Sequence, residues 1–511
     1  MATNWQTFPI EFKGGLISNL SPLQQGANAV GSATILQNFE PARSGGYTKL
    51  QGYVKADDAV VPGSGRVLGV KVVNPSEYIA ARSNGSVTEY HLSTGSGWSS
   101  LGTTALAGGK IRSTEYNFGA GHFVIFVDGT NAPKLYNDTT NTLSDITSNT
   151  DIQGAEQVAI FKNTVFFSKG SNLYFSAPSS STDFSSANGG GVINVSHGIT
   201  GLISFRDQLI IFSRNNIQRL SGTTLADFQL SPITESIGCL DPDTIQEVGG
   251  DVMYMSPDGI RLLGATDRIG DFALEVASDP IADDVYKFAQ STSNFCSIVV
   301  REKAQYRIFA YTESEQSKVA RGLLVTKFSN QGAESMAWGE SSGIKAYVAD
   351  SKYTSSAETI VFANEDGYLY QMEQGSSFDG ASIEAIYESP YMPISDPQIR
   401  KTFYKLTSYI DPKGSFSLDL STKYDFTRAN NQNLIQPAST TITSTGLAVS
   451  FYGAVVSRYN TATYGGELDK VYQNQIIGSG KTISIRIEDN STNPSFTLDT
   501  VLLEFTQNDR Q

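Results

Sequence analysis

Three features of this sequence predict an all-β protein built mainly from repeated antiparallel sheets. Its 511 residues are too many for one undivided hydrophobic core. Gly (47), Tyr (24) and Phe (27) are plentiful and charged residues make up only 17%, which favours short strands joined by turns over a helical bundle. The third feature is a hairpin-like pattern that recurs at a nearly fixed spacing along the chain.

The stretch GDVMYMSPDGIRLLG at 250–264 typifies the pattern, with two apolar runs flanking Pro-Asp-Gly. Glycine favours tight hairpin turns because it readily adopts positive φ. Similar stretches turn at Gly85, Gly129, Gly170, near Asn215, at Gly259 and at Gly367. The first four steps span 44, 41, 45 and 44 residues, and the last step of 108 residues leaves room for one enlarged unit.

A repeat of about 40–50 residues with about four strands is typical of β-propeller blades, which bury their faces by stacking in a ring. The spacing predicts six or seven four-stranded blades over residues 63–396. Within them, residues 278–290 predict one short helix with Ser278 or Asp279 as its cap.

The two ends of the chain lack the blade period. Residues 1–62 are rich in Gly, Asn, Gln and Ser and predict a mostly extended platform segment that lies on its own domain or on a neighbouring subunit. Residues 397–511 alternate apolar and polar positions and predict a separate β-sandwich.

Composition argues against several classes of protein. The net charge is −14 and no Lys/Arg-rich run occurs, so a dedicated nucleic-acid grip is not expected. Cys239 and Cys296 form no CxxC and are interpreted as buried core residues rather than a disulfide or zinc ligands. No secretory signal pattern and no apolar run of about 20 residues are found, so we expect synthesis in a cytoplasm.

The sequence predicts no catalytic, cofactor or metal site. His91, His122 and His197 do not have the spacing of metal ligands, and no nucleophile elbow or phosphate-binding loop occurs. Asp241 and Asp243 in LDPDT are interpreted as a solvated turn rather than a calcium site.

An enzyme remains a minor hypothesis, because propellers can carry the two carboxylates of a glycosidase. The candidates are Asp128, Asp207, Asp251, Asp258 and Asp366. Three of these precede turn glycines, and turn chemistry alone explains an aspartate there.

The central region resembles the tail nozzle proteins of short-tailed bacteriophages, also called tail tubular protein B or packaged-DNA stabilisation proteins. The resemblance rests on FRDQLIIFS with its flanking residues (205–220), TESIGC (234–239) and IQEVGGDVMYMSPDGIR (245–261), together with KGGLISNLSP and GGYTKLQGY near the N-terminus. The motif residues are Phe205, Arg206, Asp207, Gly249, Gly250, Asp251, Ser256, Pro257, Asp258 and Gly259.

This resemblance implies a non-enzymatic homohexamer in the virion, made in the bacterial cytoplasm, that closes the distal end of the tail. Its implied partners are the tail adaptor ring, tail fibres or tailspikes, and double-stranded DNA passing through the lumen without sequence-specific binding. Contact with the host cell envelope is a further implied interaction. No cofactor and no catalytic residue are implied.

A conduit for DNA needs a gate that opens without chemistry. The best candidate is the polar insertion YTESEQSKVARG at 311–322, with Glu313, Glu315, Lys318 and Arg321, although an exposed outer loop explains the same pattern. The Gly-rich loop at 179–191 is the second candidate.

Rival hypotheses come from other functional classes. A carbohydrate- or receptor-binding propeller, lectin-like or glycosidase-like, is favoured by the aromatic content of 11%. Against it, Trp5, Trp98 and Trp338 do not recur once per blade. A generic interaction propeller of the WD40 type would show repeated Trp-Asp and Gly-His pairs, which are missing.

Overall fold

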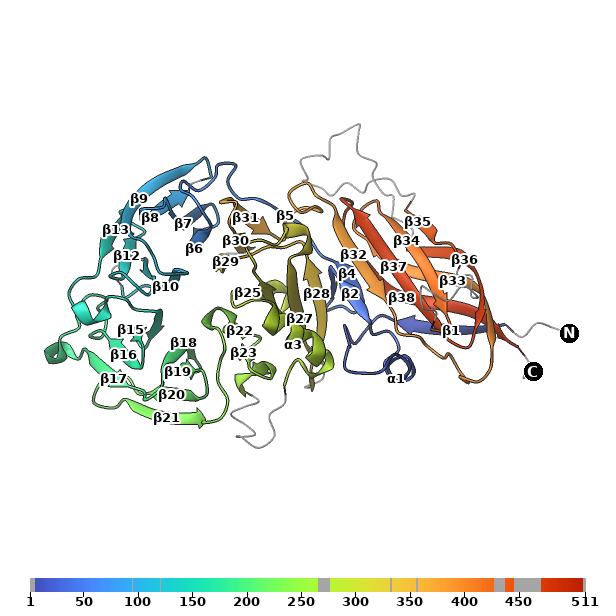
Figure 1. The fold of residues 1–511 in the computed structure, drawn as a ribbon, viewed down its shortest axis with the longest axis horizontal. Helices are drawn as coiled ribbons and strands as arrows, with labels where there is room; N and C mark the ends of the chain where they lie inside the picture. Colours follow the sequence, from blue (N-terminus) through green and yellow to red (C-terminus); the bar gives the residue numbers. More distant parts are fainter. Residues whose placement is uncertain are drawn as a thin grey trace.

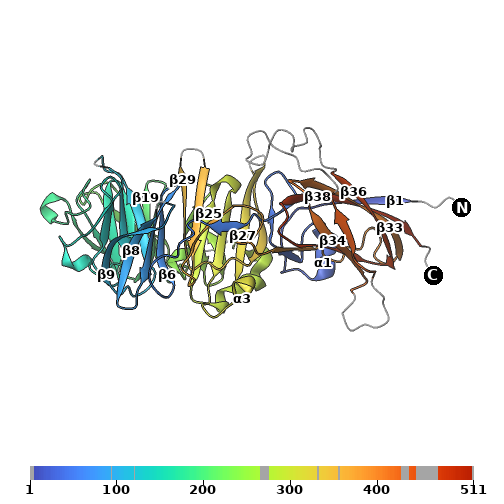
Figure 2. The same ribbon diagram turned by 90° about the horizontal axis from the view of Figure 1, so that it is seen from above.

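The structure, a computed structural model, describes residues 5–508 except 94, 120, 265–275, 331–332, 355–356, 427–436 and 445–469. It consists of a β-propeller of seven sheets with a β-sandwich attached to one side of the ring (Figure 1). Viewed at right angles, the two parts lie side by side along the long axis of the molecule (Figure 2). The predicted all-β class, with a propeller and a C-terminal sandwich, is confirmed.

Seven blades follow one another in chain order, and each begins at the strand nearest the axis (Figure 1). Blades 1 and 2 contain β6 (Val67–Asn74), β7 (Glu77–Ser83), β8 (Val87–Ser93), β9 (Trp98–Ala105), β10 (Arg112–Tyr116), β11 (Phe123–Val127), β12 (Lys134–Asn137) and β13 (Thr142–Asp145). Blades 3 and 4 contain β14 (Gln157–Phe161), β15 (Thr164–Lys169), β16 (Asn172–Phe175), β17 (Gly191–Asn194), β18 (Ile199–Phe205), β19 (Gln208–Ser213), β20 (Ile217–Ser221) and β21 (Gln229–Thr234).

The last three blades depart from the simple four-stranded pattern. Blade 5 has three strands within the described residues, β22 (Gln246–Val248), β23 (Asp251–Ser256) and β24 (Gly259–Leu262). Blade 6 contains β25 (Phe295–Val300), β26 (Gln305–Ala310), β27 (Arg321–Asn330) and β28 (Ala333–Ser342). Blade 7 contains β29 (Val348–Thr354), β30 (Ala357–Ala363), β31 (Leu369–Met372) and, from the N-terminal segment, β5 (Tyr53–Lys55).

Stacking of the blades explains why their central strands are apolar throughout rather than alternating. Each central strand is covered on both faces by its neighbours, so all six residues of β23 are buried. Aromatic side chains fill the gaps between blades. The rings of Phe212 in blade 4 and Tyr254 in blade 5, for example, have centroids 5.1 Å apart.

All five glycines of the hairpin pattern have positive φ: Gly85 (93°), Gly129 (73°), Gly170 (60°), Gly259 (144°) and Gly367 (83°). At two of them glycine is also required sterically. A Cβ on Gly367 would lie 2.0 Å from the guanidinium of Arg82, and one on Gly259 would lie 2.5 Å from the side chain of Val276. Gly259 itself is the first residue of β24, because the turn before it consists of residues 257 and 258.

The N-terminal segment closes the ring. β5 pairs with β31, with Tyr370 opposite Lys55 and Met372 opposite Tyr53. Blade 7 then packs against blade 1 through β29 and β6. A strand from the start of the chain therefore completes the blade that is made last.

The sandwich consists of two sheets. One sheet continues blade 6 outward in the order β28, β2 (Ile35–Gln37), β32 (Ile383–Glu388), β37 (Ile483–Ser491), β34 (Ser417–Tyr424) and β35 (Thr440–Thr443). The other has the order β3 (Phe39–Pro41), β4 (Tyr47–Lys49), β38 (Phe496–Gln507), β33 (Lys401–Pro412) and β36 (Val471–Gly480), with β1 (Gln6–Glu11) also paired to β38. Ile485, Ile487, Leu498 and Leu503 are fully buried in the core that includes both sheets.

Two of these elements cross the boundaries expected at residues 62 and 396. β5 belongs to the propeller although it lies in the N-terminal segment, and β32 belongs to the sandwich although it precedes residue 396. The N-terminal segment also contains a helix, α1 (Pro22–Asn28), where extended chain was expected. Proline is well tolerated in the first turn of a helix, because the N–H that it lacks would have no partner there.

The short helix expected at 278–290 is present as a 3₁₀ turn, η5 (Asp279–Ile281), followed by α3 (Ala282–Ser291). Ser278 occupies the cap position of the turn, but its hydroxyl accepts a hydrogen bond from the Ile260 N–H at 3.0 Å instead of capping. Neither α1 nor α3 has the length and hydropathy of a membrane-spanning helix.

Candidate functional site

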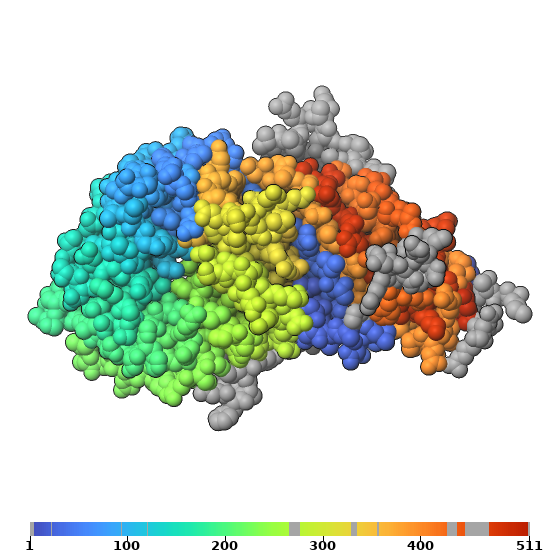
Figure 3. Space-filling model, in the orientation of Figure 1, coloured from blue at the N-terminus to red at the C-terminus, as the bar shows by residue number. Residues whose placement is uncertain are grey.

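The inner strands of the propeller surround an axial pocket of about 230 Å³. Every blade contributes to its lining, from blade 1 to blade 7 through Val70, Arg112, Gln157, Leu202, Gln246, Ser297 and Val348. In the space-filling view the blades close around the axis and leave a narrow opening (Figure 3). The pocket therefore occupies the central channel that the propeller architecture creates.

Asp243 reaches this pocket from the loop that joins blades 4 and 5. The loop forms a 3₁₀ turn, η3 (Pro242–Thr244), and the side chain of Asp241 accepts a hydrogen bond from the Asp243 N–H at 2.8 Å. Ser297 Oγ of blade 6 donates to the Asp243 carbonyl at 2.6 Å. The interpretation of the two aspartates as a solvated turn is wrong for Asp243, whose side chain is only 18% exposed.

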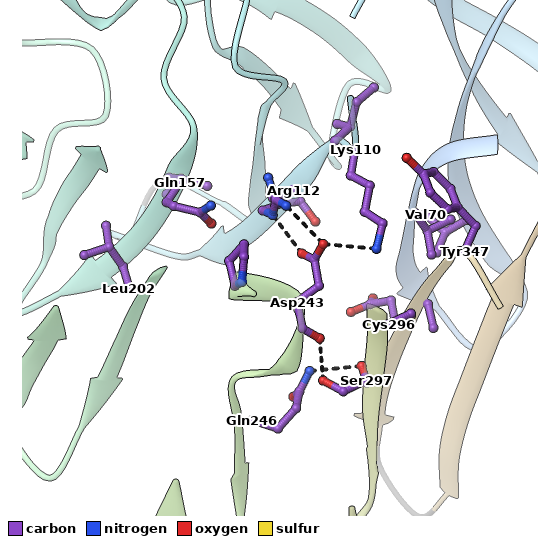
Figure 4. Close-up of a pocket in the computed structure, with 17 residues that line it drawn as sticks. Val70, Lys110, Arg112, Gln157, Leu202, Asp243, Gln246, Cys296, Ser297 and Tyr347 are labelled. Atoms are coloured by element: carbon purple, nitrogen blue, oxygen red, sulfur yellow. Dashed lines mark hydrogen bonds and ion pairs between the residues drawn. The ribbon is translucent and has the colours of Figure 1, made fainter. Parts of the chain in front are cut away.

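Two cations from the start of blade 2 hold the Asp243 carboxylate (Figure 4). Arg112 makes a bidentate contact with this carboxylate, with Nε 2.7 Å from Oδ1 and Nη2 3.0 Å from Oδ2. Lys110 Nζ lies 3.1 Å from Oδ2 and also donates to the Phe295 carbonyl. Buried charges are tolerated when they are paired in this way, because pairing offsets their lost hydration.

These contacts fix the charge state of the pocket. Burial alone would raise the pKa of Asp243, but Lys110 and Arg112 lower it to about 2, so the carboxylate stays ionised. Burial, and then the adjacent Asp243 carboxylate, raise the pKa of Asp241 to about 6. Burial also raises the pKa of the Cys296 thiol in the pocket wall to about 12, which leaves it protonated and a poor nucleophile.

Both carboxylates that line the described pocket lie beside cations. A glycosidase needs one carboxyl group that retains its proton. Of the two carboxylates that line the described pocket, Asp243 is ionised and Asp350 lies 3.2 Å from Lys71 Nζ.

The five aspartates considered as catalytic candidates do not meet at one site. Asp128 accepts hydrogen bonds from backbone N–H groups of its own turn, and Asp366 does the same and also binds the Tyr370 hydroxyl. Asp207 and Asp258 pair with cations, and Asp251 accepts from the Gly264 N–H. Their positions in blades 2, 4, 5 and 7 separate them.

The three histidines have separate local partners. His91 is buried, and burial lowers its pKa. His122 has Nε2 3.2 Å from Glu115 and Nδ1 3.3 Å from Asp138, whereas His197 Nδ1 lies 2.9 Å from the Asn216 amide. Among the described residues no group of His, Cys, Asp and Glu side chains is arranged to hold a metal ion.

The first group of motif residues lies at the β18–β19 turn of blade 4 and contacts the two neighbouring blades. Arg206 and Asp207 form the turn between β18 and β19 with φ of 46° and 60°, as a type I′ turn requires, and Phe205 before them is buried. Arg206 Nη2 donates to the carbonyl of Gly250 in blade 5 at 2.6 Å. Asp207 pairs at 2.5 Å with Lys162 of blade 3.

The second group forms the turns of blade 5. Gly249 and Gly250 join β22 to β23 with φ of 57° and 79°. Pro257 and Asp258 join β23 to β24, after the buried Ser256 and before Gly259. Arg261 Nε donates to the Asp258 carboxylate at 2.9 Å. The motif residues thus shape the hairpins of blades 4 and 5 and the contacts between them.

The proposed gate residues do not line the axial pocket. Glu313, Glu315 and Lys318 lie in the connection between β26 and β27, Arg321 begins β27, and all four are held to the rest of the protein. Lys345 Nζ donates to the carbonyls of Glu313 and Glu315 at 2.8 and 2.6 Å, Ser342 Oγ donates to that of Lys318 at 3.1 Å, and Arg321 pairs with Glu340 at 2.6 Å. Their role as a gate that closes the lumen around the DNA end stays a prediction.

The second candidate loop, at 179–191, is organised by one aspartate. Asp183 accepts from the Ser185 N–H and hydroxyl at 2.9 and 2.7 Å and from the Asn188 amide at 2.6 Å. A Cβ on Gly190 would lie 2.6 Å from the backbone of Phe184. The glycine at 190 therefore permits a close backbone approach within an ordered loop.

Sequence analysis missed a buried ionic network where the sandwich meets the ring. We call it the joint cluster: Glu40 on β3, Lys303 and Arg307 of blade 6, and Glu373 after β31. Arg307 lies 3.0 Å from Glu40 and 2.7 Å from Glu373, and Lys303 lies 2.6 and 2.5 Å from the same two carboxylates. The only local signal is an arginine inside the apolar strand QYRIFA.

No protein-family model matches the chain, and no curated protein matches it. Several solved structures resemble the fold. The extracellular domain of a putative hybrid two-component system from B. thetaiotaomicron has 11% identity to this chain and a TM-score of 0.38. The match covers 61% of this chain and 40% of that protein. YCF48 bound to D1 peptide has 11% identity and a TM-score of 0.37, covering 62% of this chain and 96% of YCF48.

A third similar structure is an exo-beta-1,3-galactanase from Phanerochaete chrysosporium. It has 10% identity and a TM-score of 0.25, and the match covers 89% of this chain and all of the galactanase, 100%. None of these three proteins is a phage tail protein. Identities and TM-scores this low support no inference about substrates or partners, so the chain is assigned here to the β-propeller architecture and to no family.

Proposed function

We propose that this chain is a structural virion protein of the tail-nozzle type, which assembles as a homohexamer and closes the tail until the genome is ejected. The observation that carries this proposal is the way in which the N-terminal segment unites the molecule. Its strands pair with β38, β32 and β28 in the sandwich region and with β31 in the propeller. The N-terminal segment therefore pairs with strands of both domains, which a subunit of a ring-shaped shell component would need in order to hold its two domains together.

Two further properties agree with this role. The axial pocket, with a volume of about 230 Å³, is far too small to hold duplex DNA, whose major groove alone is about 12 Å wide. In a nozzle the conduit would therefore run between subunits. Six chains of net charge −14 would carry 6 × (−14) = −84, which repels a phosphate backbone instead of gripping it.

The test is the native mass of the full chain, alone and mixed with the adaptor protein of the same phage. The proposal expects a hexamer in at least the mixture, and negative-stain images with the sandwich or the ring stacked on the adaptor. A protein that stays monomeric in both samples would rule out the nozzle.

A receptor- or carbohydrate-binding propeller is the second candidate, and the axial pocket favours it. A pocket lined by every blade is the usual place for a propeller ligand, since the converging inner strands supply polar groups from many directions. Glycan-array binding by the full chain tests this function. Saturable binding to one glycan class is expected, and an array without any signal would contradict it.

A further inference from the structure

The axial pocket contains more hydrogen-bond donors than its own residues use. Arg112 donates hydrogen bonds to Asp243 through Nε and Nη2, and its Nη1 makes no hydrogen bond to any described residue. Gln157 of blade 3 lines the same pocket, is only 8% exposed, and its side-chain amide makes no hydrogen bond to any described residue. Both residues line the pocket, so these donors are available to an acceptor from outside the chain.

The charges of the pocket specify the sign of that acceptor. Two cations, Lys110 and Arg112, contact one carboxylate, that of Asp243. The other lining carboxylate, Asp350, faces Lys71. Asp241 lies at the start of the η3 turn, where it accepts the Asp243 N–H. Asp243 is the carboxylate in direct contact with both cations, and the charge of Asp241 also acts on them without contact, so the cationic side of the pocket still favours an anionic acceptor at contact distance.

The walls of the pocket specify the rest of the ligand. Val70, Val158, Leu202 and Ala349 contribute apolar surface beside the polar donors. The lining of the pocket is mostly polar, but a short organic acid can bury a small apolar part against these four side chains, which an inorganic ion cannot use. A guanidinium fork beside a neutral amide donor suits the planar, two-oxygen geometry of a carboxylate.

We propose that the axial pocket binds a small organic carboxylate, whose oxygens accept hydrogen bonds from Arg112 and Gln157 while its apolar part lies against the walls. This inference rests on the second candidate function, which it deepens by naming the chemistry of the ligand. It does not depend on hexamer formation. Figure 4 shows Gln157 and Arg112 on the same side of the pocket, with Asp243 held between Arg112 and Lys110.

The experiment is a ligand-observed NMR titration of the full chain with propionate, propionamide and inorganic phosphate at equal ionic strength. Propionate should bind saturably, and propionamide and phosphate should bind at least about tenfold more weakly, the loss typical of one charge-assisted hydrogen bond. Equal binding of propionate and propionamide, equal binding of phosphate, or no saturable propionate binding would each overturn the proposal.

Variants locate the site. Gln157→Leu should weaken propionate binding about tenfold, because it removes one donor without changing charge. The matched control Gln371→Leu, on β31 outside the pocket, should leave binding unchanged. If Gln157→Leu does not fold, the isosteric Gln157→Glu serves instead and should abolish binding. Unchanged affinity in either Gln157 variant would overturn the proposal.

The two levels of the proposal can fail separately. Glycan binding without propionate binding would leave receptor recognition standing and overturn the carboxylate pocket. Propionate binding lost in Gln157→Leu, together with an empty glycan array, would support the pocket and contradict recognition of a carbohydrate receptor.

Discussion

Two of the charged clusters among the described residues differ in how their charges meet. The joint cluster sets two cations against two carboxylates, and Arg307 at its centre is 2% exposed. The axial cluster sets Lys110 and Arg112 against Asp243 beside a pocket of about 230 Å³. In the joint cluster both cations contact both carboxylates, whereas in the axial cluster one carboxylate contacts both cations and a cavity beside it leaves room for a ligand.

The largest effect expected from this comparison is that of Arg307→Met. It would leave the Glu40 and Glu373 carboxylates buried with only Lys303 as a partner, and breaking such a pair typically costs about 3–5 kcal/mol of unfolding free energy. Urea denaturation of both proteins measures this loss of unfolding free energy. Lys13→Met, which breaks an exposed pair with Glu11, is the control and should change stability by less than about 0.5 kcal/mol. A loss below about 1 kcal/mol in Arg307→Met would mean that the joint cluster does not fasten the domains.

Asp243→Asn should cost less, about 2 kcal/mol, because water in the pocket can solvate the two cations that it leaves behind. The same change removes the competing carboxylate and should tighten propionate binding. Urea denaturation tests the loss of stability, and the NMR titration tests the tighter propionate binding. A loss as large as that of Arg307→Met, without tighter binding, would erase the distinction between the two clusters.

Asp241→Asn should have a smaller, pH-dependent effect. The pKa of Asp241 is raised from 3.8 to about 6 in the folded protein, so folding favours its protonated form. Its contribution is therefore most favourable below pH about 4 and is lost as the pH rises through about 6. Asparagine keeps the oxygen that accepts the Asp243 N–H. The variant should gain stability relative to the native protein as the pH rises from 4 to 7.5, by at most about 2 kcal/mol. A difference independent of pH would contradict this assignment.

The smallest effect is expected for Arg321→Ala in the proposed gate loop. Its ion pair with Glu340 is exposed on the arginine side, at 51%, and exposed pairs contribute less than about 1 kcal/mol. Thermal denaturation should show almost no change. A marked loss of stability would show that this ion pair contributes as much to the unfolding free energy as the joint cluster does.

The repeating part of the fold could be predicted from the sequence because its signals are local. Asp258 lies in the turn before β24, which Gly259 begins, and Asp366 and Gly367 lie between β30 and β31, and the spacing of such turns gives the blade period. The sandwich and the short helix at 279–291 were accessible for the same reason, since alternation and a proline at the first helical position are patterns within a few residues.

The axial site was missed because its parts are distant in sequence. Asp243 lies 131 residues from Arg112, and LDPDT by itself is indistinguishable from an exposed turn. Glu40 and Arg307 of the joint cluster are 267 residues apart. β5 went unassigned to the propeller because a three-residue strand has no periodicity of its own, and only its pairing with β31 defines it.

The pairing of β1 with β38 has a consequence for how the protein is made. Gln6 lies opposite Phe505, 499 residues later (505 − 6). At about 5–20 residues per second, roughly 25–100 s pass between the synthesis of the two strands. β5 likewise waits for β31, which follows it by more than three hundred residues. During translation the first strands of the chain therefore emerge long before their partners exist. The propeller can therefore close only after β31 has emerged and the sandwich only after β38 has, and until then their unpaired strand edges are open to proteases and aggregation.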